Sequence, residues 1–220
     1  MDIKINAKSF FVFDLDDTLF QEVDFLKSAY AHISRKLADA IGKDIYEEMW
    51  TKYKNKENVF QWIVDHYQQS VPCIQVEWLL KEYREHVPEI TLSQETFEFL
   101  KKIKEKKVLT GLVTDGRSIT QRNKLKSLGL EGFFEDIIIS EEFGSEKPDE
   151  RNYLYFQNKY PGMDFYFFGD NTVKDFIVPD KLRWRTFCLE DQGNNIHLQS
   201  LHRLPISNYL ISSFQDIQFT

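Results

Sequence analysis

Short apolar runs recur along the chain and end abruptly in polar residues. The first run covers residues 10–13 and is followed directly by carboxylates at Asp14, Asp16 and Asp17. A continuous apolar run of this length is typical of a parallel strand that is buried on both faces. The same pattern predicts further strands at 108–113, 137–139, 165–168 and 186–189.

Segments with helical periodicity separate these predicted strands. In the segment 94–104, Phe97, Leu100 and Ile103 recur at intervals of three residues, which places them on one face of a helix. The segments 118–128 and 149–160 show a similar pattern. Strands that alternate with helices need crossover connections, which build a parallel sheet with helices on both faces. We therefore predict an α/β fold with a Rossmann-like sheet as its core.

One long segment interrupts this alternation. From about residue 20 to residue 86 we find no convincing strand, and apolar residues recur at helical spacing, beginning with Phe25, Ala29 and Ile33. We therefore predict an all-helical cap domain at 20–87. The remaining core would comprise 1–19 and 88–220, and the expected hinges are 18–22 and 86–92.

The charge balance narrows the classes of partner. The chain has 28 basic and 35 acidic residues and a net charge of −7, with no dense block of Lys and Arg. Because this average charge repels a nucleic-acid backbone, we expect no nucleic-acid partner. A phosphorylated ligand would be repelled at long range in the same way, so a phosphate site must be locally positive.

Hydropathy and cysteine content bear on the compartment. No run approaches the ~18 apolar residues that a membrane span needs, and the start of the chain lacks the pattern of a secretory signal. Cys73 and Cys188 lie far apart and match no metal-binding spacing, which favours two free thiols in a reducing compartment. We expect a cytoplasmic protein with no membrane partner, and we make no prediction of its oligomeric state.

Polar residues follow the first two predicted core strands, at the edge where open α/β sheets bind ligands. Asp14 and Asp16 stand two residues apart, so both carboxylates can face one crevice. Taken alone, such a cluster is often a solvated turn or a helix N-cap. After the next strand, Thr114 offers a hydroxyl, and Gly116 allows an anion to approach the backbone at a helix N-terminus. A capped turn is the alternative there.

Two further motifs add a cation and more carboxylates. Lys147 stands just before Pro148, which starts a predicted helix, although a single lysine in this position is usually a surface charge. Asp170 leaves an apolar strand, and Asp175 follows five residues later. Such carboxylates suit Mg²⁺, which takes a few protein oxygens together with water and phosphate. Each motif is weak alone, but their order and their common place at strand ends make a strong combination.

In this combination the chain resembles the haloacid dehalogenase superfamily of hydrolases over almost its whole length. The pattern of that family is DxDxT, a Thr or Ser after an apolar strand, a Lys, and then GDxxxxD. It is matched here by DLDDT at 14–18, by Thr114, by Lys147 and by GDNTVKD at 169–175. Gln121 and Lys124 also agree with the usual wording of the family. The helical insertion resembles the small cap of the type 1 subgroup, and the chain is most similar to its phosphatase branch.

The resemblance implies a role for each matched residue. Asp14 would attack phosphorus and form an aspartyl phosphate. Asp16 would protonate the leaving oxygen and then deprotonate the hydrolytic water. The phosphoryl oxygens would be bound by Thr114, Asp115, Gly116 and Lys147, of which Asp115 and Gly116 would act through the backbone.

The resemblance also implies a Mg²⁺ cofactor and its ligands. The metal would be held by the carboxylates of Asp14 and Asp170 and by the backbone carbonyl of Asp16. Asp175 would either support the metal or orient Lys147.

Other activities of the same superfamily compete with this interpretation. Dehalogenases typically lack the acid two residues after the nucleophile, so Asp16 argues against dehalogenation. A phosphonatase would need a cap lysine that forms a Schiff base, and no lysine of the insertion stands out. A sugar-phosphate mutase or phosphotransferase would retain all four motifs, whereas a catalytically silent scaffold should have lost an acid or the lysine. We therefore expect a Mg²⁺-dependent phosphatase whose partner is a small phosphate ester, with the mutase and the scaffold as alternatives.

Overall fold

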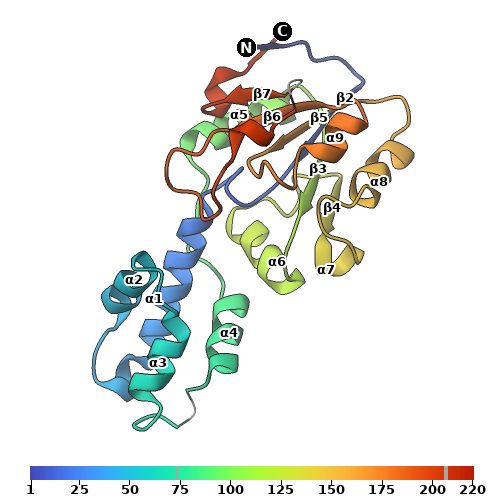
Figure 1. The fold of residues 1–220 in the computed structure, drawn as a ribbon. Helices are drawn as coiled ribbons and strands as arrows, with labels where there is room; N and C mark the ends of the chain where they lie inside the picture. The colour runs from blue at the N-terminus through green and yellow to red at the C-terminus, as the bar shows by residue number, and fades with distance from the viewer. Residues whose placement is uncertain (73, 206–207) are drawn as a thin grey trace.

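The computed structural model describes residues 1–220 except 73 and 206–207, so the expectation of a free thiol at Cys73 lies outside the described residues. Its centre is a six-stranded sheet with the order β4-β3-β2-β5-β6-β7 (Figure 1), and every neighbouring pair is parallel. The strands are β2 (Ser9–Phe13), β3 (Leu109–Thr114), β4 (Asp136–Ile139), β5 (Asp164–Gly169), β6 (Arg185–Leu189) and β7 (Tyr209–Ile211). The five apolar runs correspond to β2 to β6, and β7 was not predicted.

Strand β2 lies inside the sheet, and all five of its residues are buried. Phe13 pairs with Leu112 of β3 on one side and with Phe168 of β5 on the other. The Asp14 amide then donates to the carbonyl of Phe168 at 2.8 Å, which extends the ladder by one residue. The carboxyl ends of three strands therefore lie side by side, and the residues that follow them converge on one edge.

Helices cover both faces of the sheet, which confirms the predicted α/β fold. Because successive strand residues point to opposite faces, Phe11 and Phe13 join one apolar cluster, whereas Phe10 and Val12 join another. The first cluster includes residues of α5 and α6, and the second includes residues of α8. The helices of this core are α5 (Gln94–Glu105), α6 (Ser118–Ser127), α7 (Ser140–Phe143), α8 (Arg151–Lys159) and α9 (Ile177–Lys181).

The start of α8 differs from the prediction. Pro148 was expected to start the helix, but α8 begins at Arg151. Between them the carboxylate of Asp149 accepts a hydrogen bond from the Arg151 amide at 2.9 Å, which forms a turn ahead of the helix.

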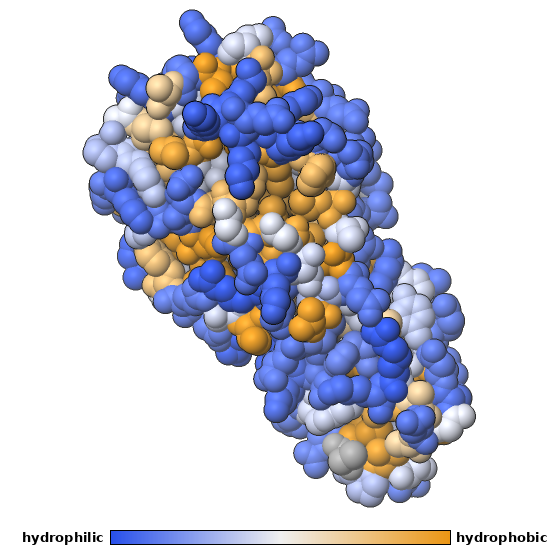
Figure 2. Space-filling view, turned by 180° about the vertical axis from the view of Figure 1, so that it is seen from behind, coloured by the Kyte–Doolittle hydropathy of each residue, from blue (hydrophilic) through white to orange (hydrophobic). Residues whose placement is uncertain are grey.

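Four helices form a separate block at 22–85, which we call the helical block. They are α1 (Glu22–Ile41), α2 (Tyr46–Lys54), α3 (Val59–Tyr67) and α4 (Val76–Glu85). Figure 1 shows the block projecting from the edge of the sheet next to α6. It has an apolar cluster of its own, which includes Ile33, Met49, Ile63 and Leu79. In the space-filling view of Figure 2 the block is the smaller of two lobes, and apolar residues are gathered mainly on the larger one.

The two ends of the chain meet on the side of the core away from the helical block (Figure 1), where β1 (Asp2–Ile3) pairs with β8 (Gln218–Phe219). Two short 3₁₀ helices, η1 (Leu201–Arg203) and η2 (Phe214–Asp216), lie in the C-terminal segment. Phe214 of η2 stacks on Phe99 of α5 with ring centres 4.4 Å apart and also contacts Phe168 of β5, so this segment packs into the core between α5 and the sheet. No helix in the described part of the chain has the length and apolarity needed to cross a membrane.

Candidate active site

A cavity of about 100 Å³ opens at the carboxyl ends of β2, β3 and β5. Its walls include six of the eight predicted site residues, namely Asp14, Asp16, Thr114, Asp115, Lys147 and Asp170. The other two, Gly116 and Asp175, do not line the cavity. Residues that are more than 150 positions apart in the sequence, such as Asp14 and Asp170, are thus brought together by the parallel pairing of their strands.

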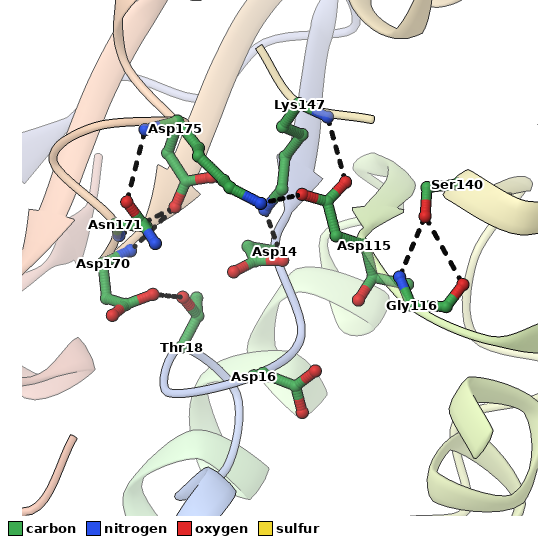
Figure 3. Close-up of polar contacts among 12 residues, drawn as sticks. Asp14, Asp16, Thr18, Asp115, Gly116, Ser140, Lys147, Asp170, Asn171 and Asp175 are labelled. Atoms are coloured by element: carbon green, nitrogen blue, oxygen red, sulfur yellow. Dashed lines mark hydrogen bonds and ion pairs between the residues drawn. The ribbon is translucent and has the colours of Figure 1, made fainter. Parts of the chain in front are cut away.

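A buried ammonium group holds two of these carboxylates. The Lys147 Nζ lies 2.7 Å from Asp14 Oδ1 and 2.7 Å from Asp175 Oδ1 (Figure 3), and all three side chains are buried. Burial alone would lower the pKa of Lys147, but the attraction of Asp14 and Asp175 outweighs it and raises that pKa well above its usual value. Lys147 therefore stays charged although it is buried among acids.

Three buried carboxylates, those of Asp14, Asp170 and Asp175, lie together beside this one ammonium group. Burial raises the pKa of Asp14 to about 8, against the effect of Lys147 and with a further contribution from the charge of Asp175. Burial, followed by the charges of Asp175 and Asp14, raises the pKa of Asp170 to about 9. Without another cation these groups resist ionisation, because each negative charge is desolvated and faces another one. The site is therefore short of positive charge.

The arrangement of oxygen atoms fits a divalent metal ion. Ligand oxygens of Asp14, Asp170 and Asp175 lie within 4.8 Å of one another. Asp175 Oδ1 contacts Lys147, and its Oδ2 accepts from the backbone amides of Asp170 and Asn171 at 3.2 and 2.9 Å. Because both oxygens of Asp175 are already engaged, Asp14 and Asp170 are the side chains best placed to bind a hard cation such as Mg²⁺.

The close approach of Asp175 depends on a glycine. A Cβ atom at Gly169 would lie 2.5 Å from Asp175 Oδ2, nearer than non-bonded atoms tolerate. The lack of a side chain at Gly169 therefore leaves room for the Asp175 carboxylate, which contacts Lys147 and accepts from two amides of the loop after β5.

Thr114 at the end of β3 and Asp115 just after it are held by different partners. Thr114 Oγ1 accepts from Gln121 Nε2 at 2.6 Å, which leaves the Thr114 hydroxyl hydrogen free to point into the cavity. The carboxylate of Asp115 accepts from the Lys147 amide at 2.9 Å and contacts the Lys174 Nζ at 2.9 Å, so it holds two cationic residues in place.

The amide of Gly116 is turned toward the start of α7. Its φ of 141° lies in the region that favours glycine, and its amide donates to Ser140 Oγ at 2.9 Å (Figure 3). In this arrangement the Gly116 amide is engaged by Ser140 and does not face the cavity.

Asp16 stands apart from the other acids. Figure 3 shows that its carboxylate does not point toward Asp14, and it is not part of the group of ligand oxygens that could share a metal. Its two oxygens instead contact the Lys124 Nζ at 2.6 Å and the Gln121 Nε2 at 2.8 Å, both from α6. Asp16 is thus held on the wall of the cavity by a helix that lies next to the helical block.

Several residues near the cavity carry no assignment from the sequence. Lys174 and His197 line it, and Asn195 Nδ2 donates to Asp170 Oδ2 at 2.9 Å. The Ile196 amide donates to Asp17 Oδ2 at 3.1 Å, which ties the loop after β6 to the residue just before the first predicted hinge. Lys174 could have been found within the GDxxxxD motif, but the loop at 190–200 has no periodic pattern that would place it here.

Comparison with known proteins agrees with this geometry. A sequence model of the family described as haloacid dehalogenase-like hydrolase matches residues 11–186. Glyceraldehyde 3-phosphate phosphatase of Methanocaldococcus jannaschii is 28% identical over 184 residues, which cover 77% of this chain and 79% of that protein. The enzyme of the same name from Methanothermobacter thermautotrophicus is 26% identical over 150 residues, covering 63% and 66%.

Solved structures share the fold at lower identity. The structure of YfnB from Bacillus subtilis, described as a HAD-hydrolase bound to magnesium, is 19% identical. It covers 96% of this chain and 97% of its own, with a TM-score of 0.61. A similarity at this level of identity establishes the fold of the chain, including both the sheet and the helical block.

Proposed function

The chain belongs to the haloacid dehalogenase-like hydrolases, and from this premise we propose that it hydrolyses a small phosphate monoester with Asp14 as the nucleophile and Mg²⁺ as the cofactor. It is a phosphatase, as its curated relatives are. The observation that carries the assignment of the nucleophile is the contact of Lys147 with Asp14 at the end of the central strand β2. A buried carboxylate beside a buried ammonium group can meet phosphorus without being repelled by the phosphoryl oxygens.

In the proposed first step Asp14 attacks phosphorus and the bond from phosphorus to the ester oxygen breaks. The Lys147 ammonium and the Thr114 hydroxyl bind the phosphoryl oxygens and offset the charge that spreads over them. Asp16 gives its proton to the departing oxygen. In the second step Asp16 takes a proton from water, which attacks phosphorus and frees Asp14 as a carboxylate again.

Mg²⁺ would be held by the carboxylates of Asp14 and Asp170. When bound, it supplies positive charge that draws the phosphoryl group toward a cluster of acids and keeps those acids ionised. Asp175 would hold this site in place by contacting Lys147 and accepting from the backbone amide of Asp170. The backbone carbonyl of Asp16 remains our third proposed protein ligand.

For the substrate we propose a short phosphorylated metabolite, of which glyceraldehyde 3-phosphate is the first to test. The two curated relatives carry that name, and the cavity of about 100 Å³ accommodates little more than the phosphoryl group. The rest of the substrate would then lie between the core and the helical block, which we propose acts as the cap at 20–87. We place this activity in the cytoplasm, where such phosphate esters are metabolised.

The decisive experiment measures phosphate release with Mg²⁺ from an aryl phosphate and from a panel of phosphorylated metabolites. Asp14→Asn should abolish release from all of them, because an amide is a poor nucleophile and a weaker metal ligand. Asp65→Asn is the matched control, since Asp65 is an exposed carboxylate on α3. Substantial activity in Asp14→Asn would contradict the proposed nucleophile. Transfer of phosphate to a second sugar phosphate in place of water would identify a mutase.

A further inference from the structure

A buried lysine that the proposed mechanism does not use contacts the acid Asp16. The Lys124 Nζ lies 2.6 Å from Asp16 Oδ1, and only 3% of the Lys124 side chain is exposed. Gln121, one turn earlier on α6, donates to Asp16 Oδ2 at 2.8 Å. The two oxygens of Asp16 are therefore held by two donors on the same face of one helix.

The same two side chains connect Asp16 to its surroundings. The side-chain amide of Gln121 also donates to Thr114 Oγ1 at 2.6 Å. This side chain therefore links Asp16 to Thr114, a residue that we propose binds phosphate. The ammonium group of Lys124 lies 4.4 Å from the ring centre of Phe25 on α1, within the range of a cation–π contact. Lys124 is thus shared between the acid and the first helix of the helical block.

Helix α6 also holds the end of α4 and the first residue of the second predicted hinge. Thr120 Oγ1 donates to the carbonyl of Arg84 at 2.9 Å. Asn123 Nδ2 donates to the carbonyls of Glu85 and His86 at 3.0 and 3.1 Å. The helix that carries Lys124 and Gln121 is therefore fastened to the hinge through side chains on neighbouring positions.

We propose that Lys124 and Gln121 are positioning residues that hold Asp16 on the leaving-group side of the cavity; this inference rests on the proposed function. When Asp14 attacks phosphorus in line, the departing oxygen lies on the opposite side of phosphorus. An acid that protonates this oxygen must stand apart from the nucleophile, and Asp16 does, while both line one cavity. Donors from α6 fix that position, because the DLDDT loop alone would leave the Asp16 side chain free to choose other rotamers.

The test compares Lys124→Met with Lys126→Met, since Lys126 is an exposed lysine on the same helix. The first step is measured as release of the alcohol in a single turnover, because the second step also uses Asp16 and is the same for every ester. The substrates are an aryl phosphate, whose leaving group needs little protonation, and the alkyl phosphate that the wild-type protein hydrolyses best. General acid catalysis contributes roughly 10²–10⁴-fold, so a misplaced acid should lower this first-step rate for the alkyl ester by about 10-fold or more. The aryl ester should change by less than about 3-fold, and Lys126→Met should change neither.

A second arm asks whether Lys124 acts through Asp16. In an Asp16→Asn background, adding Lys124→Met should change the first-step rate of the alkyl ester by less than about 2-fold, because contacting residues are non-additive when one acts through the other. An equal loss with both esters, no loss, or the same loss in the Asp16→Asn background would each overturn the proposal. If Lys124→Met lowers the yield of folded protein, Lys124→Gln keeps a hydrogen-bond donor and should show the same preference for losing the alkyl ester.

These outcomes are separable from failure of the proposed function. If Asp14→Asn remains active, the mechanism itself is wrong. If Asp14→Asn is inactive but Lys124→Met lowers the first-step rate of both esters equally, only the positioning role falls, and Lys124 has a structural role in joining α6 to the helical block.

Discussion

Gly169→Ala should damage the active site through one extra methyl group. The added Cβ would lie 2.5 Å from Asp175 Oδ2 and 2.9 Å from its Cγ. To restore an ordinary contact of 3.4 Å, the carboxylate must move by about 0.9 Å. Asp175 is fully buried and holds Lys147 and the amides of Asp170 and Asn171, so it cannot move without shifting the residues that we propose bind phosphate and metal.

The expected losses of stability and of activity follow from this displacement. Overpacking a buried site costs about 1–3 kcal/mol of unfolding free energy. A misplacement of about 1 Å near the chemistry can cost on the order of 10²-fold in rate. We therefore expect kcat/KM of Gly169→Ala to fall by about 10- to 100-fold, with a higher Mg²⁺ requirement.

The matched control is Gly111→Ala in β3. Its Cβ would lie 2.3 Å from the ring of Phe156, in the core between the sheet and α8. Urea unfolding should show a comparable loss of stability in both variants. Only Gly169→Ala should lose activity per folded molecule. Wild-type kcat/KM and an unchanged metal response in Gly169→Ala would refute the reasoning.

Three further predictions concern the metal, the hinge and the helical block. Asp170→Asn should raise the Mg²⁺ concentration for half-maximal activity by about 10-fold or more, whereas Asp175→Asn should mainly lower kcat; equal metal titrations would contradict this. Burial lowers the pKa of His86 to about 4 from its usual 6.5. Because the unfolded chain binds this proton at a higher pH than the folded chain, the unfolding free energy of the wild type should fall as the pH drops from 6.5 to 4. The unfolding free energy of His86→Gln should fall less over the same range. Equal pH slopes of the two proteins in urea unfolding would count against this prediction. Replacing 22–85 by a Gly/Ser linker should leave a folded core, seen by circular dichroism, that still hydrolyses an aryl phosphate slowly; an unchanged ranking of metabolites would show that specificity lies in the core.

The sequence by itself determined five strands of the sheet and the main chemical groups. Continuous apolar runs such as 10–13 and 165–168 are typical of strands buried on both faces, so they predicted β2 to β6, whereas β7 was not predicted. Because parallel strands end at the same edge, Asp14, Thr114 and Asp170 could be predicted to converge without any knowledge of distances. The structure confirms the strands and brings these three side chains into one cavity.

What the tertiary structure decided is how each of these groups is held. The partner of Asp16 depends on the rotation and height of α6 against the sheet, which no local pattern encodes, so the sequence matched Lys124 to the family but did not predict its contact with Asp16. The loop that brings Asn195 to Asp170 is irregular and therefore carries no periodic signal. Gly116 shows the same limit, because its amide is turned by Ser140 from another strand end. Hydrophobic periodicity reports burial along one element, whereas these contacts depend on how separate elements pack together.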